Sequence, residues 1–229
     1  MEGAAYNAAV VTPARVALIF DMDNTLIGSR IDFPAIRRSL IAMLRTTGAV
    51  DESDEVLMRR ALAQLVAIGA AHDRHHGTAL ARRMWEIIEA HEAEGLRDAL
   101  PLDGAAEVLG TLRARGFRIA VLTNNGRTGA VDALHASGLG GLAETVIARD
   151  DAGALKPAGD GVWEAVRRLG SVERSYVIGD SWIDGAAAAE AGARFIAYRR
   201  SAEELGDRGI HPWCCVAHLG ELLALDFTT

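Results

Sequence analysis

The chain has 229 residues, of which 50% are hydrophobic and 24% are charged, so it is long enough to bury a sizeable core and is not a disordered or fibrous protein. Its 31 acidic side chains outnumber the 24 basic ones and give a net charge of −7, which argues against a general nucleic-acid or anionic-membrane partner. No apolar run approaches the length of a membrane span, and residues 1–14 read as a flexible tail without the pattern of a secretory signal.

The first structured segment is the apolar run of residues 16–20, which is followed directly by Asp21 and by Asp23. The run predicts a fully buried strand that delivers two carboxylates to the edge of a sheet. Residues two apart in a strand point the same way, so both carboxylates face one site and require a cation or a shared proton. This is the electrostatic setting of metal-assisted phosphoryl transfer, and the alternative is an ordinary strand followed by an acidic loop.

The next seventy residues change to helical periodicity, which is too long for a simple loop and predicts an inserted bundle of helices. Its expected helices run from Pro34 to Gly48, from a cap at Asp51 or Ser53 to Gly69, and from Leu80 to Gly95. We therefore expect a helical cap at 29–100 within a core formed by 15–28 and 101–229.

From Pro101 onward, strands alternate with helices. Strands are expected at 118–122, 145–148, 175–178 and 195–198, and helices at 105–115, 128–137, 162–169 and 183–191. Repeated βα units predict an α/β fold with a doubly wound, Rossmann-like parallel sheet that has helices on both faces.

Polar side chains follow three of these later segments. Thr123 and Asn124 end one strand, and their hydroxyl and amide groups suit phosphate oxygens, although Asn-Asn-Gly is also a turn sequence. Lys156 precedes a proline and suits the offsetting of carboxylate and phosphoryl charge, although a single lysine usually faces solvent. Asp180 and Asp184 end another strand at the start of a helix, where the alternative is a helix cap followed by an exposed acid.

Together these pieces resemble the haloacid dehalogenase-like hydrolase superfamily, and within it the phosphoglycolate phosphatase-like branch with a helical cap. The matching motifs are Asp21-Met22-Asp23-Asn24-Thr25, Thr123, Lys156-Pro157 and Gly179-Asp180-Ser181 with Asp184, in the family's order between about Val16 and Tyr198. Two positions depart from the commonest pattern: Asn24 stands where glycine is frequent, and Lys156-Pro157-Ala158-Gly159 replaces Lys-Pro-Asp-Pro. Neither departure removes a catalytic group.

The resemblance implies a role for each matching residue. Asp21 is the nucleophile that forms an aspartyl-phosphate, and Asp23 is the general acid and base. The Asp21 carboxylate, the Asp23 main-chain carbonyl and Asp180 hold Mg²⁺, and Asp184 acts behind them or through water. Thr123, Asn124 and Lys156 bind the phosphoryl group. The implied enzyme is a Mg²⁺-dependent phosphatase for a small phosphorylated metabolite, such as phosphoglycolate or a sugar phosphate, and the presence of Asp23 favours phosphate chemistry over dehalogenation.

Two other activities remain open at this stage: a phosphomutase that uses the same intermediate, and a regulatory or binding protein without turnover. A cap that closes over an anionic substrate needs cations, so Arg30 and Arg74 are candidate substrate-binding residues. The cluster around Arg74, residues 72–76, contains three histidines, and we interpret it as a solvated loop between helices in preference to a transition-metal site. Cys214 and Cys215 are adjacent, which disfavours a disulfide, predicts a buried pair and indicates a cytoplasmic protein. The sequence leaves open whether the protein is a monomer or a homodimer.

Overall fold

The structure is a computed structural model that describes residues 12–228. Most of the tail predicted at 1–14 lies outside the described residues, and Pro13–Arg15 form a short 3₁₀ helix, η1, before the first strand. The core is a six-stranded sheet in which every neighbouring pair of strands is parallel. Its spatial order is β5 (Thr145–Ile147), β4 (Arg118–Leu122), β1 (Val16–Asp21), β6 (Arg174–Gly179), β7 (Arg194–Tyr198) and β8 (Cys214–Val216). This is the order of a doubly wound Rossmann-like sheet, so the predicted fold class is confirmed.

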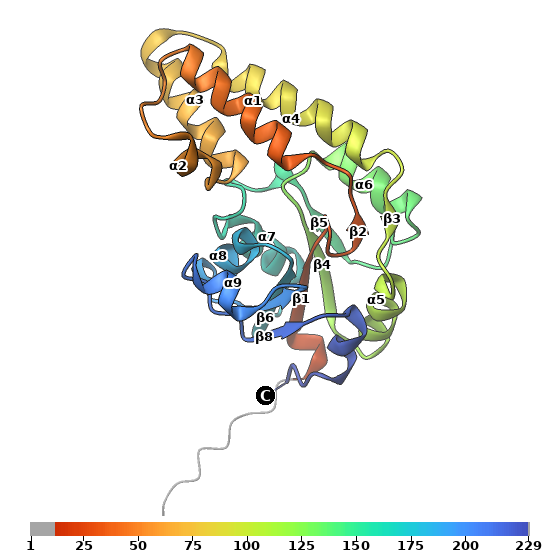
Figure 1. The fold of residues 1–229 in the computed structure, drawn as a ribbon. Coiled ribbons are helices and arrows are strands. Elements are labelled where there is room, and N and C mark those ends of the chain that lie inside the picture. The colour runs from red at the N-terminus through yellow and green to blue at the C-terminus, as the bar shows by residue number, and fades with distance from the viewer. Residues whose placement is uncertain (1–11, 229) are drawn as a thin grey trace, which may run out of the picture.

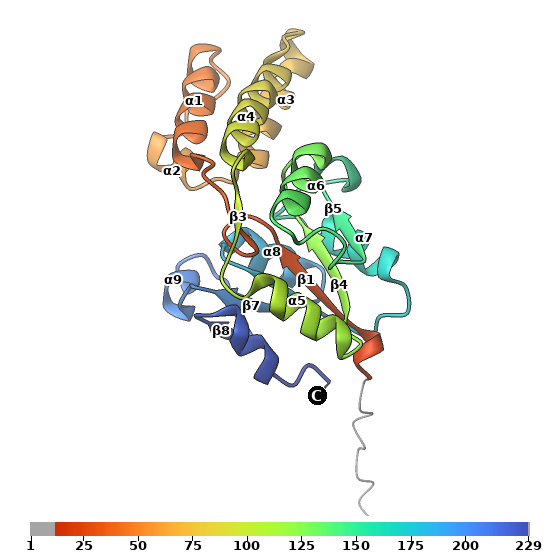
Figure 2. The ribbon, with the colours of Figure 1, turned by 90° about the vertical axis from the view of Figure 1, so that its right-hand side faces the viewer.

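Helices cover both faces of the sheet because alternate residues of the buried strands point to opposite sides (Figure 2). Val16, Leu18 and Phe20 of β1 belong to one apolar cluster with α5 (Ala105–Ala114) and α6 (Arg127–Ala136). Ala17 and Ile19 belong to a second cluster with α7 (Asp160–Leu169), α8 (Trp182–Glu190) and α9 (Ala202–Gly206). The expected strand at 118–122 coincides with β4, and the other expected core elements agree with the structure within two residues.

Four helices stand above the carboxyl ends of the core strands and form what we call the cap helices (Figure 1). They are α1 (Phe33–Thr46), α2 (Asp54–Met58), α3 (Leu62–His76) and α4 (Leu80–Leu96). Two chain segments join them to the core, and β2 (Ile27–Gly28) pairs antiparallel with β3 (Leu100–Pro101) where these segments meet. The division of the chain at 28/29 and 100/101 into two separately moving domains stays a prediction.

The helix starts predicted in the cap follow from local chemistry. The Asp32 side chain accepts a hydrogen bond from the Ala35 amide at 2.8 Å at the start of α1, and Pro34 lies in the first turn. Of the two candidate caps for the second helix, Ser53 caps α2. Gly48 follows α1 with a φ of 69° and ends it as expected.

The second predicted helix is wrong in two ways. It is broken at residues 59–61 into α2 and α3, and it does not end at Gly69. Gly69 is buried inside α3, where a Cβ would lie 2.7 Å from the sulfur of Met84, so this glycine allows α3 and α4 to approach each other. The helix continues through residues 72–76, which are its last turns and not a loop, and ends at Gly77 with a φ of 64°.

The C-terminal part contains elements that the sequence analysis missed, namely α9 and the edge strand β8. Two further 3₁₀ helices are η2 (Arg149–Asp151) and η3 (Leu219–Ala224). Cys214 and Cys215 lie in β8, and the expected burial of this pair is wrong: Cys214 is half-buried and Cys215 is exposed, because an edge strand has a neighbour on one side only. Among the described residues, no helix has the length and apolar character that crossing a bilayer requires.

Candidate active site

Three neighbouring strands deliver the candidate residues to one edge of the sheet. β1 lies between β4 and β6, and it ends in Asp21, while Thr123 follows β4 and Asp180 follows β6. Connections leave this edge toward opposite faces of the sheet, which opens a crevice at the carboxyl ends of the central strands. The fold therefore brings together side chains that are about a hundred residues apart in the sequence.

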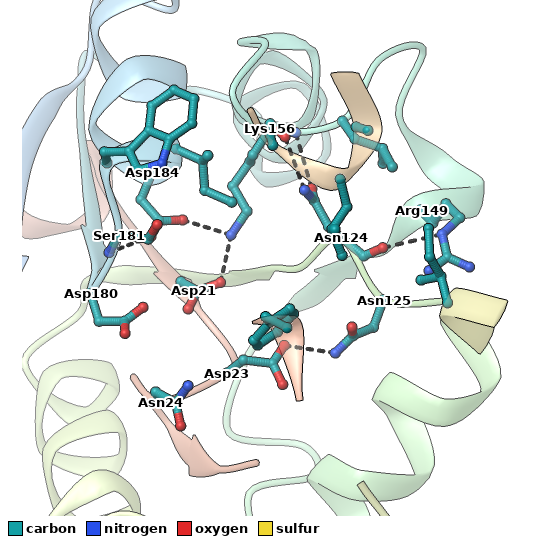
Figure 3. A pocket seen from close by; sticks show the side chains of 18 of the residues that line it. Asp21, Asp23, Asn24, Asn124, Asn125, Arg149, Lys156, Asp180, Ser181 and Asp184 are labelled. Carbon is teal, nitrogen blue, oxygen red and sulfur yellow. Dashed lines mark hydrogen bonds and ion pairs between the residues drawn. The ribbon is translucent and has the colours of Figure 1, made fainter. Parts of the chain in front are cut away.

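Three carboxylates and one ammonium group form the centre of the site. Asp21, Asp180 and Asp184 each offer an oxygen, and these oxygens lie within 4.8 Å of one another. Lys156 Nζ donates to Asp21 Oδ1 at 2.5 Å and to Asp184 Oδ1 at 2.7 Å, so its side chain lies between the two acids (Figure 3). One lysine offsets only part of the negative charge that these acids carry when ionised.

The low polarity of the site opposes this concentration of negative charge. Burial, together with the nearby Asp21 carboxylate, raises the pKa of Asp180 to about 7. The same two causes raise the pKa of Asp184 to about 7, although the charge of Lys156 acts in the opposite direction. Burial by itself lowers the pKa of Lys156, but the carboxylates of Asp184 and Asp21 outweigh burial and raise it. Lys156 is thus held as a cation, and the acids around it favour additional positive charge.

The two oxygens of Asp23 have different surroundings. Oδ2 accepts a hydrogen bond from Asn125 Nδ2 at 2.7 Å and a longer one from Thr123 Oγ1 at 3.4 Å. Oδ1 is buried and has no hydrogen-bond partner among residues 12–228. Burial, followed by the charge of Asp21, raises the pKa of Asp23 to about 6. One oxygen of this carboxyl is therefore anchored by Asn125 and Thr123, and the raised pKa suits the carboxyl to exchange a proton near neutral pH.

The turn after β1 explains one departure from the usual family motif. Asn24 has a φ of 57°, in the left-handed region that glycine and asparagine adopt most readily. The main-chain amide of Asn24 donates to the Ile27 carbonyl at 2.7 Å and closes the turn. Asn24 therefore fulfils the conformational role of the more frequent glycine.

A second glycine makes room for an acid of the site. At Gly179, the last residue of β6, a Cβ atom would overlap the carboxylate of Asp184. That carboxylate also accepts a hydrogen bond from the Ser181 amide at 3.1 Å through Oδ2. Both Asp184 oxygens are therefore occupied by protein donors, which fits the expectation that Asp184 acts from behind the other acids.

The loop after β4 holds the lysine in place. The Asn124 side chain donates to the Lys156 carbonyl at 2.9 Å and accepts from the Lys156 amide at 3.0 Å. Thr123 is buried, and its hydroxyl accepts a hydrogen bond from the Asn125 amide at 3.1 Å. Asn125, which anchors Asp23, was missed in the sequence because an Asn-Asn-Gly run is equally typical of a turn.

A cavity of about 300 Å³ joins this cluster to the cap helices. The predicted residues that line it are Asp21, Asp23, Asn124, Lys156, Asp180 and Asp184. The sequence analysis missed its cap-side lining, which includes Phe33, Arg37, Leu62, Trp85, Ile88 and Glu92. Arg30 and Arg74 are exposed and do not line the cavity, so their predicted substrate contact is not favoured by the geometry. The arginines that do line it are Arg37, Arg149 and Arg200.

Arg149 connects the core to the cap. Its guanidinium forms ion pairs with Glu92, which is buried in α4, and with the exposed Glu89 at 3.4 Å, and it lies 4.4 Å from the centre of the Trp85 ring. Arg149 Nε also donates to the Asn124 carbonyl at 3.2 Å (Figure 3). Burial raises the pKa of Glu92 to about 7 despite its pairing with Arg149.

The acidic cluster suits a hard divalent cation such as Mg²⁺, which prefers carboxylate oxygens. Asp21, Asp180 and Asp184 are the only set of three acid, histidine or cysteine side chains grouped tightly enough for a metal within residues 12–228. The histidines at 72–76 are therefore not part of such a set. Asp73 instead accepts hydrogen bonds from the amides of Leu80 and Ala81 at 2.8 and 2.9 Å and caps the start of α4.

Comparison with known proteins matches residues 16–192 to the model of the haloacid dehalogenase-like hydrolases. The chain belongs to this hydrolase family. It is 30% identical over 181 residues to a phosphoglycolate phosphatase of Caulobacter vibrioides, and the aligned region covers 76% of this chain and 75% of the relative. It is 32% identical over 186 residues to a phosphoglycolate phosphatase of Cereibacter sphaeroides, and the aligned region covers 78% of this chain and 82% of the relative. This family member is accordingly a phosphatase-type hydrolase.

Solved structures agree with the fold. A hydrolase from Pseudomonas syringae superposes with a TM-score of 0.67 at 22% identity, over 91% of this chain and 96% of the other. A haloacid dehalogenase-like hydrolase from Bacteroides fragilis gives a TM-score of 0.65 at 21% identity, over 90% and 98% of the two chains. The core and the inserted helices therefore follow an arrangement that occurs in other members of this fold.

Proposed function

We propose that the chain is a Mg²⁺-dependent phosphatase that hydrolyses a small phosphorylated metabolite through an aspartyl-phosphate on Asp21. The observation that supports this most directly is the convergence of Asp21, Asp180, Asp184 and Lys156 in the lining of one cavity. An ordinary strand followed by an acidic loop would not bring further acids and a lysine to its two carboxylates. Phosphoryl transfer depends mainly on position and charge, and this arrangement supplies both.

In the proposed reaction, an oxygen of Asp21 attacks phosphorus while the bond from phosphorus to the leaving oxygen breaks. Asp23, whose pKa is raised to about 6, gives a proton to that leaving oxygen. In the second half, Asp23 takes a proton from a water molecule, the water oxygen attacks phosphorus, and the bond to Asp21 breaks. Inorganic phosphate leaves, and both carboxyl groups return to their starting states.

Lys156 and the loop after β4 hold the reacting groups in place. Lys156 orients Asp21 through the 2.5 Å contact and offsets negative charge on the transferring group. Thr123 and nearby amides bind phosphoryl oxygens, and Asn124 fixes the main chain of Lys156. Mg²⁺, held by the Asp21 and Asp180 carboxylates and the Asp23 carbonyl, would neutralise charge on the phosphoryl oxygens.

The cap helices would control access to this chemistry. They supply one wall of the cavity, and the ion pair of Arg149 with Glu92 holds them against the core. We propose that opening of the cap admits substrate and releases phosphate, while closure excludes bulk water during transfer. The relatives named phosphoglycolate phosphatases make phosphoglycolate the first substrate to test.

The test measures phosphate release from phosphoglycolate and from an aryl phosphate whose ring carries no charge, with Mg²⁺ and with excess chelator. Asp21→Asn preserves shape but removes the nucleophile, and we expect it to lower kcat by about a thousandfold or more. Asp132→Asn, at an exposed position in α6, is the matched control. Turnover that survives both the chelator and Asp21→Asn would refute the mechanism, and a phosphorylated product formed without free phosphate would identify a phosphomutase.

A further inference from the structure

Arg37, in α1 of the cap, lines the active-site cavity without an acidic partner. Its Nε donates to the main-chain carbonyl of Arg60 at 3.1 Å, and its side chain is half-buried. No carboxylate within residues 12–228 forms an ion pair with its guanidinium. A half-buried cation without a counter-ion is unfavourable unless a ligand supplies the negative charge.

The neighbours of Arg37 increase this excess of positive charge. Burial lowers the pKa of Arg37, and the charge of Arg208 lowers it further. Arg208 donates to the Arg59 carbonyl at 2.7 Å, and its guanidinium lies 5.0 Å from the ring centre of Trp182, which also lines the cavity. Repelling arginines thus gather beside the cavity in a chain whose net charge is −7. Such a group is a favourable place for an anion.

The other arginines of the cavity are already engaged. Arg149 is paired with Glu92 and Glu89 and stacks on Trp85. Arg200 is exposed and donates through Nε to the Asp180 carbonyl at 2.9 Å. Arg37 is therefore the partly buried arginine of this lining whose charge the described protein leaves uncompensated.

The core side of the cavity has the complementary role. Lys156 lines the cavity beside Asp21, where the phosphoryl group of a substrate is proposed to bind, whereas Thr123 is buried behind this lining. Apolar and aromatic side chains line the cavity as well, among them Phe33, Leu62 and Trp182. A ligand that fills this space therefore meets cationic groups contributed by both the core and the cap, together with an apolar surface suited to a short organic spacer.

We propose that Arg37 binds a second anionic group of the substrate, so that the enzyme prefers phosphomonoesters that carry a carboxylate or another phosphate on a short spacer. This inference rests on the proposed function, because it takes the phosphoryl group to lie beside Asp21. Bidentate contact between a guanidinium and a planar carboxylate or a phosphate is strong and directional, so it selects substrates by charge and shape together.

Matched substrate pairs test the assignment. Phosphoglycolate is compared with ethyl phosphate, and propane-1,3-diol bisphosphate with propyl phosphate, so that each pair differs in the second anionic group. The measured quantity is the ratio of kcat/KM for the member with the second anionic group to that for the member without it. In Arg37→Gln we expect this ratio to fall about 10- to 100-fold, chiefly through KM, and the pair that falls more identifies the preferred anion.

Arg38→Gln provides the matched control, because Arg38 is the next residue of the same helix but is exposed and does not line the cavity. It should keep the wild-type ratio, whereas Arg37→Lys should lose less than Arg37→Gln because it retains the charge. An unchanged ratio in Arg37→Gln, with hydrolysis intact, would overturn the role of Arg37 alone. If the wild-type enzyme hydrolyses none of the four compounds, the proposed function is overturned as well.

Discussion

Glu92 provides a test of how the cap is held against the core. This carboxyl is 9% exposed, pairs with Arg149 and accepts a hydrogen bond from the Gly126 amide at 3.5 Å. Burial raises its pKa from 4.5 to about 7, although the charge of Arg149 acts in the opposite direction. The folded protein therefore retains a proton on Glu92 over a pH range in which the unfolded chain has released it. Glu92→Gln removes this titration and keeps a side chain of similar shape.

The sign of the effect follows from proton linkage. Between pH 4.5 and about 7, the folded state binds more protons at position 92 than the unfolded state, so the wild-type free energy of unfolding falls as pH rises. At about 1.4 kcal/mol per pKa unit, the full change is about 3 kcal/mol. The other buried acids of the site are present in both proteins, so the difference between the two reports on Glu92 together with its electrostatic coupling to Asp23.

Urea unfolding at pH 5, 6, 7 and 8, followed by circular dichroism, measures this difference. We expect the stability of wild type minus that of Glu92→Gln to fall by about 2.5 kcal/mol from pH 5 to pH 8, which is most of the full change. Glu89→Gln is the control, because Glu89 contacts the same guanidinium from an exposed position, and such pairs contribute about 0–1 kcal/mol. A difference that stays constant, or that grows with pH, would refute the account of Glu92 as a carboxyl whose charge burial disfavours.

Two further predictions concern the backbone around the site. Because Asn24 has a φ of 57°, Asn24→Ala should lower stability by about 1 kcal/mol in thermal unfolding while Asn24→Gly changes it little; equal losses would contradict the conformational role. Gly179→Ala should displace the Asp184 carboxylate from Lys156 and lower kcat for aryl phosphate hydrolysis at least about tenfold, because a 1 Å misplacement of a reacting group has a large effect. Gly110→Ala, in α5 where a Cβ meets open space, is its control, and equal activity of the two variants would count against the positioning of Asp184.

The core was predictable because its signals are local. Each central strand is a short apolar run that ends in polar residues, as in residues 16–21, 118–123 and 174–180. The run of apolar residues and the polar residues at its end define such a segment without tertiary information. The convergence of Asp21, Thr123 and Asp180 then follows from the parallel order of the strands. The turn at Asn24 was noted as a departure from the family motif, and its positive φ supplies the physical reason.

The cap lining was not predictable in the same way. Arg37 differs little in sequence from Arg30 or Arg74, and its place on the cavity depends on how α1 packs over the core. The break between α2 and α3 was missed because apolar residues continue on both sides of it. Gly69 was taken as a helix end because glycine is typical of helix ends, whereas here it permits close packing of α3 on α4. Helical periodicity identifies which face is buried, but not which neighbouring element covers it.

The connection between the cap and the lysine of the site is a continuous set of contacts. Glu92 binds Arg149, Arg149 binds the Asn124 carbonyl, and the Asn124 side chain holds the main chain of Lys156 from both sides. Lys156 in turn contacts Asp21. If the cap opens, Arg149 loses Glu92 and Trp85 together, which removes two of the contacts that hold its guanidinium against the loop after β4. The same residue that anchors the closed cap thereby also supports the loop that positions Lys156, so in the proposed mechanism closure does more than exclude water.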